Sequence, residues 1–233
     1  MRLRKLIPKY LRLEYKLRKR KATDKKSGIC FAVAHASEYT PPFSIEVTQP
    51  IRQSSHYENK IDNIRLGADF IENYIIGQNE TLSFWEAIGN PSSQRGFKVG
   101  RNLIEGKLQA DYGGGLCQLS GLIYICALKA GMNITERHNH TVDIYTEEER
   151  FTPLGSDATI VYGYKDLRVA NPYPFDVRFE FEIKDSRIIC KLLSEQQIKE
   201  RTLEFRRNKI QDKIHVETFA DGIYIGDSLY LTQ

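Results

Sequence analysis

The sequence lacks the features of several specialised protein classes. Its 233 residues include only four cysteines, and no two of them form a CxxC pair. No stretch approaches the roughly 18 consecutive apolar residues that a membrane-spanning helix needs. The basic N-terminus is not followed by an apolar segment, so we expect no secretory signal peptide and a cytoplasmic protein with reduced thiols.

The composition is typical of a globular protein with a hydrophobic core. Hydrophobic residues make up 41% of the chain, charged residues 27% and aromatic residues 11%. These fractions exclude a disordered chain and a disulfide-stapled miniprotein. At about 100–200 residues per domain, the length predicts one large domain, or one domain with arms.

Charge is distributed unevenly along the chain. Residues 1–27 carry 12 Lys or Arg but only two acidic residues, a net charge of +10, whereas the remainder carries −6. A set of apolar residues in this arm follows helical spacing: Leu3, Leu6, Ile7, Tyr10, Leu13 and Leu17. Such a helix can pack on its own domain or lie on an anionic membrane, which would make the protein peripheral at the inner face. Nucleic acid is not expected as a partner, because no aromatic stacking pattern accompanies the charge.

The hydrophobic pattern predicts an α+β fold in which a buried central helix packs on an antiparallel sheet. Up to residue 130 we expect a short buried strand at 28–34, a loop or edge strand at 35–58, an amphipathic helix at 60–76, a strand at 82–85, a hairpin at 99–108 and a buried helix at 116–130. Strands are expected next at 141–145, 158–162, 166–170, 177–183 and 187–193, then a short helix or linker at 194–212 and a hairpin at 213–231. Three parts follow from this pattern: a basic arm (1–27), an α+β domain (28–195), and a charged linker with a C-terminal hairpin (196–233).

Cys117 is the strongest candidate for a reactive residue. It follows three glycines and opens the predicted buried helix. A thiol at a helix N-terminus lies near unpaired backbone N–H groups and the positive end of the helix dipole, which favours the nucleophilic thiolate. Gly114 and Gly115 would let a substrate approach closely, and Gln118 or the Cys117 N–H could bind an oxyanion. The other cysteines, Cys30, Cys126 and Cys190, lie in apolar runs and are expected to be buried and inert.

Two later segments could complete a catalytic site around this thiol. His138 and His140 open a predicted strand and would share one face of it, while Asp157 begins the next strand. Cysteine, histidine and aspartate in this order form a workable triad: the thiolate attacks, the imidazole moves the proton and the carboxylate orients the imidazole. His140 is preferred as the base because it lies further into the strand, which leaves His138 to contact substrate.

A metal site is the alternative use of the same side chains. His138, His140 and Cys117 could supply three zinc ligands, although an HxH pair without a second cluster is a weak signal. We therefore expect no bound metal. The glycine triplet is followed by neither Lys-Ser nor Lys-Thr, and its spacing does not form a dinucleotide fingerprint, so no cofactor is expected either.

Several motifs together resemble the VanW family. They comprise Gly-Gly-Gly-Leu-Cys-Gln-Leu-Ser at 113–120, Glu-Arg-His-Asn-His at 136–140 and Gly-Ser-Asp-Ala-Thr at 155–159, and the similarity extends over about residues 60–185. The resemblance implies a link to vancomycin resistance and cell-envelope biology, without an established activity.

The order of the three residues is also similar, more distantly, to that of transglutaminase-like, papain-type cysteine enzymes. That similarity implies Cys117 as nucleophile, His140 as base and Asp157 as orienter. The resulting hypothesis is cysteine-dependent amide hydrolysis or acyl transfer on a peptide or peptidoglycan-like substrate. The alternative is a non-catalytic module that binds a cell-wall fragment or a protein partner.

Overall fold

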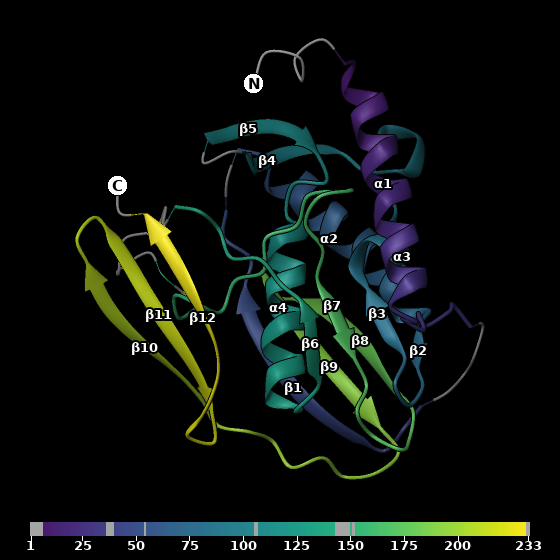
Figure 1. The fold of residues 1–233 in the computed structure, drawn as a ribbon, viewed down its shortest axis with the longest axis vertical. Helices are drawn as coiled ribbons and strands as arrows, with labels where there is room; N and C mark the ends of the chain where they lie inside the picture. Colours follow the sequence, from purple (N-terminus) through teal and green to yellow (C-terminus); the bar gives the residue numbers. More distant parts are fainter. Residues whose placement is uncertain are drawn as a thin grey trace.

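In the computed structural model, α-helices pack against small antiparallel sheets (Figure 1). The structure describes residues 7–35, 40–53, 55–104, 107–142, 150 and 152–231. The α+β class is therefore confirmed. Its largest sheet has the strand order β1-β9-β8-β2, formed by Phe43–Pro50, Arg187–Ser194, Val177–Lys184 and Ile75–Ile76.

Helix α4 (Leu116–Lys129) forms the centre of the core. Residues on all its sides are buried, as the sequence predicts for a helix that is apolar all round. It packs against β1, β9 and α2 (Tyr57–Glu72), as Figure 1 shows. Gly131, with φ +68°, follows the end of the helix in the left-handed conformation that ends helices.

Three smaller sheets complete the fold. Strands β3 (Thr81–Ser83), β7 (Arg168–Ala170) and β6 (Asn133–Glu136) form one. The short helix α3 (Phe84–Ile88) follows β3 and contacts it, and the 3₁₀ turn η2 (Ser93–Arg95) comes later in the chain. Strands β4 (Val99–Ile104) and β5 (Lys107–Tyr112) form the predicted hairpin. The third contains β10 (Leu203–Ile210), β11 (Lys213–Ala220) and β12 (Ile223–Leu231), of which β11 and β12 form the predicted terminal hairpin.

Several predicted elements differ from the structure. The strand predicted at 82–85 ends at Ser83, and Phe84 begins helix α3. Residues 28–34 form only two single bridges, Phe31 with Thr81 of β3 and Ala34 with Tyr74, because no strand runs alongside the whole segment. Residues 158–162 form no strand and contain one bridge residue, Val161. Residues 203–210 form β10 instead of a helix or linker. Of the strand predicted at 141–145, only Thr141 and Val142 are described, and Val142 forms a single bridge with Leu231.

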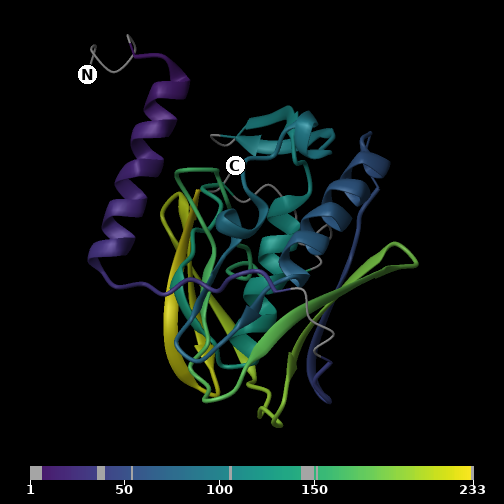
Figure 2. The same ribbon diagram turned by 90° about the vertical axis from the view of Figure 1, so that its right-hand side faces the viewer.

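The basic arm forms helix α1 (Lys9–Lys26), which lies along one edge of the molecule (Figure 2). Its C-terminal half is joined to the rest of the chain through Arg20, which hydrogen-bonds to Glu136, and through Asp24, which hydrogen-bonds to Arg168. No helix among the described residues is both long enough and apolar enough to cross a membrane.

Candidate functional site

Cys117 is the second residue of α4, directly after the glycine loop. Gly115 caps the helix in the left-handed conformation, with φ +105°. This turn aims the helix N-terminus at the site, so the thiol lies at the positive end of the helix dipole. Cys117 as a residue is partly exposed, whereas its thiol is in a buried environment.

The structure brings His140 and Asp157 together with Cys117. His140 Nδ1 lies 2.6 Å from Asp157 Oδ2, and the same carboxylate oxygen accepts the backbone N–H of His140 at 2.6 Å. The imidazole also lies near the Cys117 side chain, close enough for each group to shift the pKa of the other. His140 therefore lies between a thiol and a carboxylate, which is the arrangement that a catalytic triad requires.

The pKa shifts of the three groups favour a thiolate–imidazolium pair. Burial by itself would raise the pKa of Cys117, but the hydrogen bond and charge of His140 lower it. Burial likewise opposes protonation of His140, yet its hydrogen bonds with Asp157 and Cys117 raise its pKa to about 10. Burial would raise the pKa of Asp157, but His140 and Arg137 hold it at about 2.

Two further groups contact the thiol and were not identified from the sequence. The backbone N–H of Ile160 and the side chain of Thr159 both face Cys117 closely enough to lower its pKa. Thr159 lies two residues after Asp157 in the Asp-Ala-Thr motif, so one short segment contacts both the thiol and the imidazole. Thr159 could have been identified from the sequence, because it belongs to the same Asp-Ala-Thr motif as Asp157. Nothing in the sequence indicated a role for the Ile160 N–H.

Asp157 is held by residues from two other parts of the chain. The Arg137 guanidinium donates to Asp157 Oδ1 at 3.2 Å and to the backbone oxygens of Asp157 and Gly155, both at 2.8 Å. The hydroxyl of Tyr230, from β12, donates to the same carboxylate oxygen. The C-terminal sheet therefore contributes to the site.

The Asp-Ala-Thr segment is fixed against α4 by hydrogen bonds rather than by a strand ladder. The Ser120 hydroxyl donates to the carbonyl oxygen of Ala158 at 2.6 Å. The backbone N–H of Thr159 donates to the carbonyl oxygen of His138 at 2.6 Å. These bonds explain how Asp157 reaches His140 without the predicted strand.

The glycines of the loop allow the protein to pack closely on itself. A Cβ on Gly114 would lie 2.6 Å from the Cα of Gly100 in the β4–β5 hairpin, and one on Gly115 would lie 2.9 Å from Lys60 Cγ in α2. Protein atoms thus occupy the space beside both glycines. Gln118 donates from Nε2 to the carbonyl oxygen of Pro50 at 2.8 Å, which directs its amide N–H group at the end of β1. Their roles toward a substrate stay predictions.

Asn63 connects α2, the hairpin and the glycine loop. It is completely buried, its Nδ2 donates to the carbonyl oxygens of Lys98 (2.9 Å) and Gly114 (3.0 Å), and its Oδ1 accepts the Lys98 N–H at 2.7 Å. Asn63→Ala leaves these backbone groups without partners, so we expect it to lower the free energy of unfolding by about 2–4 kcal/mol.

Urea unfolding measures this effect, and Asn59→Ala is the matched control. Asn59 lies one turn earlier in α2 and donates a single bond, to the carbonyl oxygen of Val99 at 2.9 Å, at the surface. Removing it should cost about 1 kcal/mol or less. Equal losses in the two variants would contradict the role assigned to Asn63.

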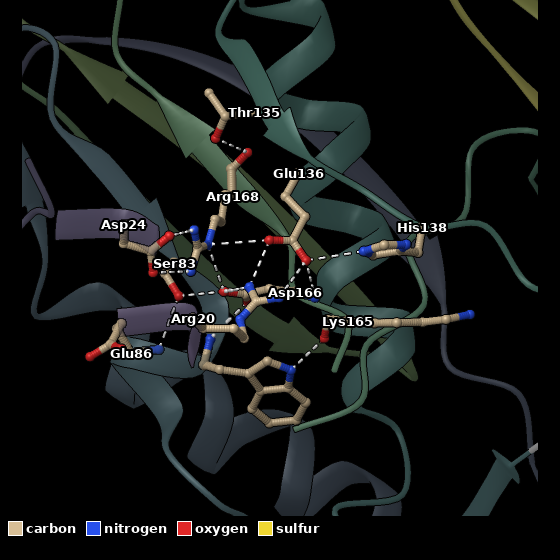
Figure 3. A network of polar contacts seen from close by, with 11 residues as sticks. Arg20, Asp24, Ser83, Glu86, Thr135, Glu136, His138, Lys165, Asp166 and Arg168 are labelled. Atoms are coloured by element: carbon tan, nitrogen blue, oxygen red, sulfur yellow. Dashed lines mark hydrogen bonds and ion pairs between the residues drawn. The ribbon is translucent and has the colours of Figure 1, made fainter. Parts of the chain in front are cut away.

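His138 belongs to a different cluster from His140. Its Nε2 lies 3.0 Å from Glu136 Oε1, in a buried ionic network that joins α1 to β6 and β7 (Figure 3). Arg168 pairs with both oxygens of Asp24, at 2.7 and 2.9 Å, and Arg20 with both oxygens of Glu136, at 3.1 and 2.6 Å. The two histidines therefore contact different carboxylates, although they lie two residues apart.

In the described part of the chain, no group of three or more His, Cys, Asp or Glu side chains could hold a metal ion. Of the other cysteines, Cys126 and Cys190 are buried as expected. Cys30 is exposed, so the expectation that it is buried was wrong. Its segment forms isolated bridges and not the buried strand predicted for it.

The central part of the chain is similar in sequence to known proteins. Residues 59–193, more than half of it, match the family model described as "VanW like protein". "Vancomycin B-type resistance protein VanW" of Enterococcus faecalis (strain ATCC 700802 / V583) is 31% identical over 142 residues, 61% of this chain and 52% of that protein. "Uncharacterized protein YoaR" of Bacillus subtilis (strain 168) is 32% identical over 120 residues, 52% of this chain and 38% of that protein.

The matched regions span about half or less of the length of these two relatives. No solved structure is significantly similar to the chain. The resemblance to transglutaminase-like enzymes therefore stays a hypothesis based on the order of the three residues.

Proposed function

Because this chain belongs to the family of VanW-like proteins, we propose that it is a cysteine-dependent amidase or acyl transferase that acts on peptide or amino-sugar material of the cell envelope. The observation that supports the chemistry is the position of His140, whose Nδ1 lies 2.6 Å from Asp157 Oδ2 and whose proximity to Cys117 lowers the pKa of the thiol. The envelope substrate rests on the name of the Enterococcus faecalis relative, a vancomycin resistance protein.

In the proposed reaction, the Cys117 thiolate attacks an amide carbonyl carbon and forms a C–S bond. The C–N bond then breaks, and the leaving nitrogen takes the proton that His140 Nε2 holds in the imidazolium state. Water or an acceptor amine gives up a proton to His140 and releases the acyl group from sulfur. Asp157 keeps Nδ1 hydrogen-bonded, so that Nε2 faces the reaction throughout.

The test measures the rate of iodoacetamide alkylation at each cysteine as a function of pH, by peptide mass spectrometry. In the wild type, Cys117 should react as a thiolate below the free-thiol pKa of about 8.5. In His140→Ala its midpoint should move to higher pH, because the hydrogen bond and charge that lower its pKa are lost.

Two matched controls make the result specific. His138→Ala removes an imidazole that contacts Glu136, so it should leave the Cys117 profile unchanged. Exposed Cys30 reports, in the same molecule, any general change in reagent access. If Cys117 titrates like Cys30 in the wild type, the thiolate mechanism is excluded, and the non-catalytic binding module becomes the better reading.

A further inference from the structure

We propose that the outward face of α1 docks the protein on an anionic phospholipid surface. The proposal concerns a surface separate from the cysteine site and stands whether or not that site is catalytic.

Helix α1 uses one face to contact the rest of the chain. Leu13 and Leu17 lie against Gly163, and Arg20 and Asp24 enter the ionic network. These residues recur at steps of three and four, so they form one stripe of the helix. Figure 2 shows α1 at the periphery, with its outer side clear of the remaining elements.

A second apolar stripe points away from the body. Leu11 is 45% exposed and Tyr15 is 65% exposed, and Ile7, just before the helix, is 47% exposed. Leu11 and Tyr15 each lie two residues from Leu13, about 200° around the helix axis, so they face the opposite direction. Apolar and aromatic side chains turned outward on a surface helix are typical of helices that lie in a membrane interface.

The positive charge of α1 favours binding to an anionic surface. The helix contains only two acidic residues, Glu14 and Asp24, and Asp24 is used inward in its pair with Arg168. Exposed lysines flank the apolar stripe along the helix, at Lys19, Lys21, Lys25 and Lys26. Because residues 28–233 carry a net charge of −6, an anionic bilayer would attract this helix and repel the rest of the chain.

A groove where α1 meets the rest of the chain carries donors suited to a lipid phosphate. It has a volume of about 420 Å³ and separates α1 from the turn at Gly163 and Tyr164. Lys16, Lys19 and the hydroxyl residues Thr23 and Ser27 line its helix side. Arg20 and Arg168 in its lining are already paired with carboxylates, and Lys16 Nζ lies 5.9 Å from the centre of the Tyr164 ring. No carboxylate in the described residues pairs with Lys16 or Lys19, so these two lysines supply the charge for an anionic ligand.

The experiment measures co-sedimentation of the full chain with phosphatidylcholine vesicles, with or without phosphatidylglycerol, at low and high salt. The wild type should bind only the vesicles with phosphatidylglycerol, and less at high salt. Lys16→Gln/Lys19→Gln should weaken the partition at least roughly tenfold, because each cation near the surface contributes to binding. Leu11→Gln/Tyr15→Gln should also weaken binding to these vesicles, because the apolar side chains that would insert into the interface are lost.

Each variant has a control with the same chemical change elsewhere. Lys184→Gln/Lys209→Gln removes two exposed lysines, and Ile223→Gln/Tyr224→Gln removes an exposed aliphatic and an exposed aromatic residue. Both controls should bind like the wild type, and circular dichroism establishes that all variants are folded.

Three results would overturn the proposal. The wild type could fail to bind the phosphatidylglycerol vesicles, or the α1 variants could bind as well as the controls. Third, sedimentation without lipid could show a wild-type dimer that Leu11→Gln/Tyr15→Gln dissociates, which would make a second copy of the chain the occupant of the stripe.

Discussion

Arg168→Met should lower the free energy of unfolding by about 3–5 kcal/mol at neutral pH. The Arg168 side chain is 8% exposed and lies among three carboxylates. Its distances are 2.7 Å to Asp24, 3.2 Å to Asp166 and 3.4 Å to Glu136. Methionine fills part of the same volume but carries no charge. The three carboxylates would then share a single guanidinium, that of Arg20 (Figure 3).

Urea unfolding at pH 7 and pH 5 tests whether charge causes this loss. The variant should lose less stability at pH 5, because protonation neutralises carboxylates that lack a cation. The direction follows from burial, which already raises the pKa of Asp166 with Arg168 present. An equal loss at both pH values would assign the effect to packing.

Arg18→Met provides the matched control for this substitution. Arg18 pairs with Glu14 at 2.8 Å on the same helix α1, but its side chain is 80% exposed. An exposed pair of this kind contributes about 0.5 kcal/mol or less. If Arg18→Met also lowered the free energy of unfolding strongly, disturbance of helix α1 and not loss of the buried charge would explain the effect of both substitutions.

Gly114→Ala is expected to destabilise the glycine loop by about 1–3 kcal/mol or more. Its new Cβ would lie 2.6 and 2.7 Å from the Cα and carbonyl carbon of Gly100 and 2.8 Å from the nitrogen of Arg101. These are backbone atoms, so the β4–β5 hairpin must move away from the start of α4. Thermal unfolding measures the loss, and Cys117 alkylation reports whether the helix start moves with it.

Gly121→Ala makes the same chemical change in a place with room for it. Gly121 lies within α4, and an added Cβ would meet its nearest atom, the Ala158 nitrogen, at 3.6 Å. Alanine in a helix is favoured over glycine, so this variant should be as stable as the wild type or more stable by about 1 kcal/mol. Destabilisation of both variants to the same extent would rule out the close approach to Gly100 as the cause.

Elements with a strong local signal were predicted well. The run from Leu116 to Ala130 is apolar on every side, and this pattern has few solutions other than a buried helix. The hairpin at β11 and β12 was also predicted, because Asp221 and Gly222 form a turn between two alternating runs. In both cases the residues that determine the element lie within it.

Strand β10 was missed because its pattern depends on its neighbours. Its residues are mostly exposed, so hydrophobic alternation is weak. It forms a strand because β11 supplies a complete ladder from Leu203 to Ile210. The opposite error occurred at 158–162, where an apolar run lies beside α4 and its carbonyl at Ala158 is hydrogen-bonded by Ser120.

The sequence by itself determined the chemical types of the candidate site: a cysteine at a helix start, two histidines and an aspartate further along the chain. Local patterns suffice for this, because a glycine loop before an apolar run predicts a helix N-terminus wherever the chain folds. Only the tertiary structure decided which histidine contacts which carboxylate. His138 and His140 are separated by one residue, yet Glu136 and Asp157 bind them separately. The same holds for Tyr230, whose hydroxyl reaches Asp157 across a sequence separation of 73 residues. Such contacts depend on how distant segments pack, which no local pattern encodes.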